Sequence, residues 1–130
     1  MKKALVATVV VFIVWGVMDF IIHGMILQSA YASTPTLWRP QAEIRMPTLY
    51  LSVLIGALAF CVIYSTLIKP KSALNALQFG LWYGIASGIG MGYGTYAVQP
   101  IPYMMALTWF LGTTAEAVVG GLIVGAMIKE

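Results

Sequence analysis

The chain has 130 residues, of which 61% are hydrophobic and only 8% are charged, and its formal net charge is +3. Soluble domains carry about 25% charged residues, so this composition cannot cover a water-facing surface and excludes an ordinary soluble protein. The positive charge does not indicate nucleic-acid binding, because the lysines stand at the ends of apolar runs, where membrane proteins place them.

Four long apolar runs dominate the sequence, at 4–27, 49–68, 73–98 and 101–128. Each has at least the roughly 20 residues that a helix needs to cross a hydrocarbon core about 30 Å thick. The only connection of any size is the loop at 28–48, which leaves no room for a separate soluble domain. We therefore predict an all-α membrane fold, a single transmembrane domain over 1–130 built as an antiparallel four-helix transmembrane bundle.

The lysines also predict the orientation of this bundle. They lie near the two termini and in the second connection, at Lys2, Lys3, Lys69, Lys71 and Lys129. Four spans place these three regions on one side of the membrane, so the positive-inside rule makes both termini cytoplasmic. The first run followed by "AYA" also resembles a secretory signal, but its length and its polar residues favour a retained span. We expect a multi-pass protein of a bacterial inner (plasma) membrane, with the lipid bilayer as its first partner.

The first run, 4–27, contains an acid, Asp19, and the only histidine of the chain, His23. These residues are four positions apart, so they stack on one face of a helix. A second acid, Glu116, stands deep in the fourth run between two glycines. At 1.5 Å per residue from the same membrane side, Asp19 and Glu116 are roughly 22 Å and 18 Å deep. We predict that the three side chains form a buried polar cluster.

This cluster has three interpretations. Polar side chains hold membrane helices together through hydrogen bonds, and ionisable groups at this depth also serve as proton relays. A metal or haem site is the third, with Met18 or Met25 as additional ligands to Asp19, His23 and Glu116. It is the weakest, because a closed zinc site needs four ligands and one histidine provides bis-histidine haem only across a dimer. We expect no metal ion and no cofactor.

The outer loop at 28–48 holds three prolines, which oppose a continuous helix. Aromatic residues near the outer interface form either a belt at the lipid headgroups or a cap over the bundle: Tyr31, Trp38, Tyr50, Tyr96 and Tyr103. The turn "KPKS" predicts that Ser72 caps the third helix. Because the second and third connections are so short, we expect the last three spans to pack side by side as antiparallel neighbours.

Small residues form rows along the last two spans. In the third run Gly80, Gly84, Gly88 and Gly92 recur every four residues. The fourth run carries one row with Gly121 and Gly125 and another with Gly112 and Gly120. In lipid, helices associate through close backbone contact at small residues, so we predict that these eight glycines pack helices together. The stretch "GIGMGYG" also favours local kinking.

The stretches "VWGVMDFIIHG", "GLWYGIASGIGMGYG", "QPIPYMMALTW" and "AEAVVGGLIVG" occur in an order that resembles small bacterial four-span integral membrane proteins of unknown function. The resemblance covers most of the chain and implies a fold but no chemistry. No phosphate-binding loop and no hydrolase motif is present.

We therefore predict a non-enzymatic integral membrane protein that acts through helix association, as a homo-oligomer or with another membrane subunit, and binds no nucleic acid. The alternative is a small proton-linked channel or transporter with Asp19, His23 and Glu116 as its relay. A metal- or haem-binding redox protein comes third.

Overall fold

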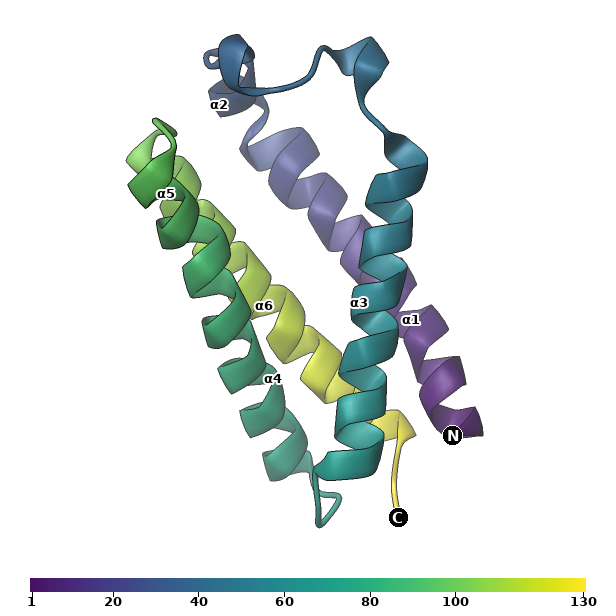
Figure 1. Cartoon of the computed structure of the whole chain (residues 1–130). Coiled ribbons are helices and arrows are strands. Elements are labelled where there is room, and N and C mark those ends of the chain that lie inside the picture. The colour runs from purple at the N-terminus through teal and green to yellow at the C-terminus, as the bar shows by residue number, and fades with distance from the viewer.

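The computed structural model describes residues 1–130, which form helices and turns without any β-strand (Figure 1). Three helical stretches are long and apolar enough to cross a membrane. The first combines α1 (Lys2–Asp19) with the π-helix η1 (Phe20–Ile26), and the others are α3 (Met46–Leu67) and α6 (Tyr103–Met127). The predicted all-α class is confirmed.

The fourth predicted span, 73–98, is helical over the same residues but is divided into three pieces. These are α4 (Ala73–Ile89), the π-helix η4 (Gly90–Gly94) and α5 (Thr95–Val98). With 17 residues, α4 alone is shorter than the roughly 20 residues of a span. The glycines of "GIGMGYG" mark the point where the α-helix changes to a π-helix, and the expected kinking stays a prediction. A crossing by this segment, and the cytoplasmic orientation of the termini, stay predictions.

The long connection between α1 and α3 contains only short helical turns, as its prolines predicted. They are α2 (Gln28–Ala32), η2 (Pro35–Leu37) and η3 (Gln41–Glu43). One proline of the region, Pro47, lies in the first turn of α3 instead of the loop. Proline is tolerated there because the first N–H groups of a helix have no intrahelical acceptor, so α3 begins three residues before the expected start at 49.

The long helices pack as two pairs. α4 lies antiparallel to α6, with α5 above it, and α3 packs on α1, which also contacts α6. The expectation that all of the last three spans pack side by side is wrong for α3 and α4, which diverge upward in Figure 1. Aromatic side chains fill the space between them: the ring of Phe60 on α3 lies 4.6 Å from Phe79 and 5.0 Å from Tyr83 on α4. Rings of this size keep the two backbones apart.

Two clusters of buried apolar side chains occupy different levels of the molecule. The lower cluster joins α1, α3, α4 and α6 and includes Val11, Phe60 and Cys61. The upper cluster joins the end of η1 to the start of α6 and includes Ile22 and Trp109. Cys61 is free and fully buried, in keeping with a small hydrophobic role. Two residues of the candidate site are part of the upper level, since Trp109 belongs to its cluster and Tyr31 packs against it.

Candidate functional site

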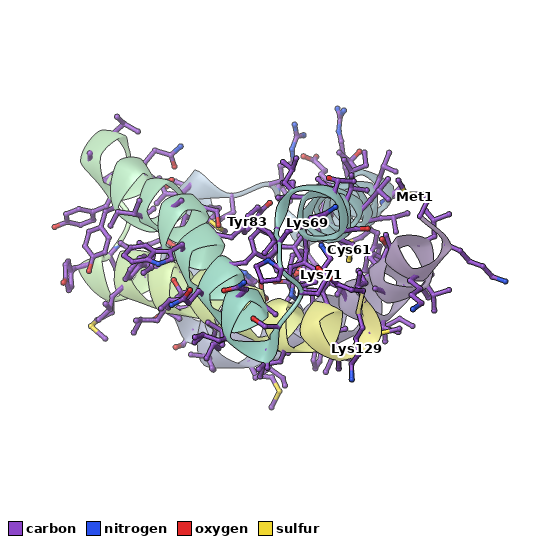
Figure 2. The ribbon with its side chains drawn as sticks, turned by 90° about the horizontal axis from the view of Figure 1, so that it is seen from below. Met1, Cys61, Lys69, Lys71, Tyr83 and Lys129 are labelled. Atoms are coloured by element: carbon purple, nitrogen blue, oxygen red, sulfur yellow. The ribbon has the colours of Figure 1, made fainter.

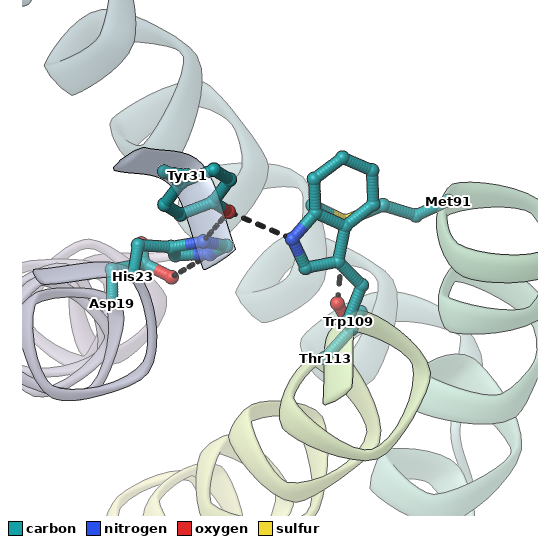
Figure 3. A network of polar contacts seen from close by, with 6 residues as sticks. All are labelled: Asp19, His23, Tyr31, Met91, Trp109 and Thr113. Atoms are coloured by element: carbon teal, nitrogen blue, oxygen red, sulfur yellow. Dashed lines mark hydrogen bonds and ion pairs between the residues drawn. The ribbon is translucent and has the colours of Figure 1, made fainter. Parts of the chain in front are cut away.

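A chain of hydrogen bonds connects α6 to η1 through the outer loop (Figure 3). The indole Nε1–H of Trp109 donates to the phenol oxygen of Tyr31 at 2.8 Å. That oxygen lies 2.6 Å from Nδ1 of His23. Because the phenol oxygen already accepts a hydrogen bond from the indole, its own hydrogen is available for Nδ1. In neutral imidazole this arrangement places the ring proton on Nε2.

The other ring nitrogen of His23 faces an acid. Nε2 is 3.9 Å from Oδ1 of Asp19, one turn earlier in the chain. The distance exceeds that of a hydrogen bond, so the two groups form an ion pair only when the imidazole is protonated. The side chains of Asp19 and His23 are 33% and 34% exposed. The predicted pair on one face is therefore present, but it is only partly buried, contrary to the expectation of a buried cluster.

Glu116 extends the same group of residues from the side of α6. Its carboxyl group lies close enough to that of Asp19 to exchange a hydrogen bond with it when one of the two acids is protonated. Oε1 of Glu116 is buried and has no other hydrogen-bond partner. Asp19 thus stands between His23 and Glu116.

Tyr31 belongs to this site, although its place in the sequence indicated only an interfacial aromatic residue. Burial raises the pKa of the Tyr31 phenol; the hydrogen bond from Trp109 opposes this increase in pKa and the charge of Asp19 adds to it. The phenol therefore stays protonated at neutral pH and remains a donor to His23. No spacing signal could have identified Tyr31, because its role depends on α6, a segment far along the chain.

The outer loop forms a cap over this site instead of a belt alone. The ring of Trp38 lies 5.1 Å from Tyr31 and 5.9 Å from Trp109, edge to face in both cases. Its indole N–H donates to the hydroxyl oxygen of Thr34 at 2.9 Å, which fixes the ring over the site. The remaining predicted aromatic residues are exposed, as expected of a belt: Tyr50, Tyr96 and Tyr103.

The four glycines of the predicted row in the third run, Gly80, Gly84, Gly88 and Gly92, all face α6. A Cβ at Gly84 would lie 2.7 Å from Cα of Thr114, and one at Gly88 would lie 2.9 Å from the carbonyl oxygen of Phe110. At Gly80 and Gly92 a Cβ would meet carbonyl oxygens of α6. Only glycine therefore fits along this row, and α4 and η4 lie against the backbone of α6.

The two glycine rows of α6 face different partners. A Cβ at Gly121 would lie 2.5 Å from the carbonyl oxygen of Ala76 on α4, and one at Gly125 would lie 2.6 Å from the Cβ of Ala76. A Cβ at Gly112 would instead meet Ile22, and one at Gly120 would meet the rings of Trp15 and Phe60. The second row therefore places Glu116 on the side of α6 that faces α1.

No group of three or more His, Cys, Asp or Glu side chains is arranged to hold a metal ion. Asp19 approaches His23 on one side and Glu116 on the other.

Comparison of the chain with protein-family models, with curated proteins and with solved structures finds no match.

Proposed function

We propose that this chain is a small proton-linked channel or transporter of a bacterial inner membrane, in which Asp19, His23 and Glu116 carry the proton. It crosses the membrane four times as an antiparallel bundle, with both termini in the cytoplasm. The observation that supports this function is the polar line from Trp109 through Tyr31 to His23, Asp19 and Glu116. Ionisable groups at membrane depth are functional candidates by default.

The incomplete pairing within this line favours a relay over structural support. Buried polar groups that only hold helices together have their hydrogen bonds satisfied. Here Oε1 of Glu116 is buried without another partner, and His23 and Asp19 are separated by 3.9 Å. Glu116 and Asp19 are therefore able to gain or lose a proton without breaking a strong contact, whereas His23 gains a proton only at Nδ1, where Tyr31 must change from donor to acceptor.

The surroundings of Glu116 favour a gated transporter over an open channel. Below this residue, the rings of Trp15 and Phe60 meet edge to face at 5.2 Å and pack against Gly120. Apolar rings block a continuous path for protons toward the lysine-rich end. Passage therefore requires a movement of α1 against α6, as alternating access does in transporters.

The test is proton flux into liposomes that contain the purified protein, measured between about pH 5 and pH 8, where histidine changes its charge. Glu116→Gln and Asp19→Asn preserve shape and hydrogen bonding but remove the exchangeable proton. The matched control is Glu43→Gln, which changes an exposed acid of the outer loop. We expect proton flux in the wild type and in the control. Both site variants should lose this flux although they remain folded. Equal flux in all four proteins, or no flux in the wild type, would contradict the relay.

A second candidate is the helix-association function, as a homo-oligomer or accessory subunit. It is favoured by the exposure of Asp19 and His23, because polar side chains left in hydrocarbon are costly and a second polypeptide would cover them. The glycine rows do not provide that interface, since they are occupied within the chain. Cross-linking from cysteines placed beside Asp19 would detect such a partner. If association is the function, Asp19→Asn would keep the cross-link, whereas a large residue at position 19 would abolish it.

A further inference from the structure

Two hollows adjoin each other at the end of the molecule opposite the outer loop, and they share Lys69. The first has a volume of about 450 Å³ and is predominantly polar. Four lysines line it together with Glu130: Lys3, Lys69, Lys71 and Lys129. Figure 2 shows three of them, Lys69, Lys71 and Lys129, around the lower ends of α3 and α6.

One of these lysines has a structural role. The ammonium group of Lys71 donates to the carbonyl oxygens of Tyr64 and Ser65 at 2.8 Å and 3.0 Å, and to that of Ile68 at 2.5 Å. It therefore caps the C-terminal end of α3. Its backbone N–H donates to Oε1 of Glu130 at 3.0 Å. The side-chain carboxylate of Glu130, which lines the hollow, thus already accepts a hydrogen bond from a backbone group.

The other three lysines have no acidic partner. The single ion pair of the chain within 4.0 Å is that of His23 with Asp19, at the other level of the molecule. Lys3, Lys69 and Lys129 consequently bring three positive charges to a hollow in which the charges of Lys71 and Glu130 offset each other, so the hollow keeps a net positive charge. An anion with several oxygen atoms would relieve their repulsion and accept their hydrogen bonds.

The second hollow is an open groove of about 580 Å³ along the lower parts of α3 and α4. Its lining is mostly apolar and includes Leu67, Phe79 and Trp82, of which Trp82 is 66% exposed. A free phosphate ion would gain no favourable contact from such an apolar groove, whereas an acyl chain would pack along it. Tryptophan, moreover, is the residue preferred where a membrane meets water.

We propose that these two hollows together bind one anionic phospholipid. The phosphate lies among Lys3, Lys69 and Lys129, and an acyl chain follows the groove over Leu67 and Trp82. Basic hollows between helices on the cytoplasmic side of membrane proteins suit anionic headgroups in this way. The site is separate from the polar line at Glu116 and does not depend on proton transport.

The experiment offers the purified, delipidated protein equal amounts of phosphatidylglycerol and phosphatidylcholine with the same acyl chains. Native mass spectrometry then counts the retained lipids. We expect the wild type to prefer phosphatidylglycerol and Lys69→Gln to reduce that preference about fivefold, as the loss of one lysine near an anionic headgroup predicts. The matched control is Lys2→Gln, which removes a charge at the same end but outside both hollows. It should retain the wild-type preference.

Two further measurements distinguish a bound lipid from a bound simple anion. Trp82→Ala should weaken phosphatidylglycerol retention, and inorganic phosphate should displace this lipid poorly. Circular dichroism verifies that each variant is folded. The proposal fails if both lipids are retained equally, or if Lys69→Gln behaves like Lys2→Gln. It also fails if phosphate displaces the lipid readily while Trp82→Ala has no effect, since that result describes an anion site without an acyl chain.

Discussion

The indole N–H of Trp15 donates a 2.7 Å hydrogen bond to the backbone carbonyl oxygen of Glu116. The ring reaches this carbonyl because position 120 is glycine: a Cβ there would lie 3.0 Å from Cζ2 of Trp15. Trp15 and Asp19 are one turn apart on α1, so they share a face. Trp15 therefore contacts the backbone of Glu116 while Asp19 approaches its side chain. This bond fixes the register of α1 against α6 at the candidate site.

Trp15→Phe keeps an aromatic ring at this position but removes the donor. We expect the free energy of unfolding to fall by about 1 kcal/mol, the usual contribution of one such hydrogen bond. Denaturation in detergent micelles measures the change. Trp82→Phe is the control, because Trp82 is 66% exposed. If both variants lose the same stability, the bond to Glu116 has no special role.

Gly84→Ala tests the contact of α4 with α6. A methyl group at this position lies 2.7 Å from Cα of Thr114, so the helices must separate. Overpacking of this kind costs about 1–3 kcal/mol, and thermal denaturation should show a lower midpoint. Gly90→Ala is the matched control on the same segment, since a Cβ there meets nothing within 4 Å. Its stability should change by less than about 0.5 kcal/mol, and a comparable loss there would contradict the packing argument.

Tyr31→Phe tests the link between the outer loop and His23. The variant leaves the Trp109 N–H without its acceptor, so we expect a loss of about 1–3 kcal/mol at neutral pH. Tyr50→Phe, an exposed tyrosine of α3, should have no effect. A negligible change in Tyr31→Phe would show that the hydrogen bonds at 2.8 Å and 2.6 Å contribute nothing to stability.

The same variant has a predicted pH dependence. Because burial raises the pKa of Tyr31 above its ordinary value of 10.0, the folded protein favours the protonated phenol more than the unfolded chain does. This contribution is complete below pH 10.0 and is lost as the pH rises through the pKa of the folded state. The stability difference between wild type and Tyr31→Phe should therefore narrow above pH 10.0. Unfolding measured at increasing alkaline pH verifies this, and a constant difference would contradict it.

Lys71→Met tests the cap of α3. The ammonium group holds three carbonyl oxygens at the end of this helix, including those of Tyr64 and Ile68. Without it these oxygens lose their charged donor, and we expect a loss of about 1–2 kcal/mol. Lys129→Met removes a lysine of the same hollow that forms no such bonds, so it should leave the stability close to that of the wild type. Urea denaturation of both variants without lipid separates the cap from general charge effects.

The sequence by itself determined the positions of the long helices. Apolar runs identified all four helical segments to within a few residues, because a long uninterrupted apolar stretch is a signal that depends only on residues close together in the chain. It also identified the cap of α4, where Ser72 Oγ accepts from the N–H of Asn75 at 3.0 Å. Local signals of this kind depend only on residues close together in the chain.

The tertiary structure alone decided which segments meet and which residues join the site. Short turns suggested that α3 and α4 are neighbours, but the rings of Phe60 and Phe79 between them keep the backbones apart. Tyr31 joins the site through Trp109, which is 78 positions away in the chain. A contact between such distant residues depends on how whole helices pack, because packing fixes the distances on which every hydrogen bond depends.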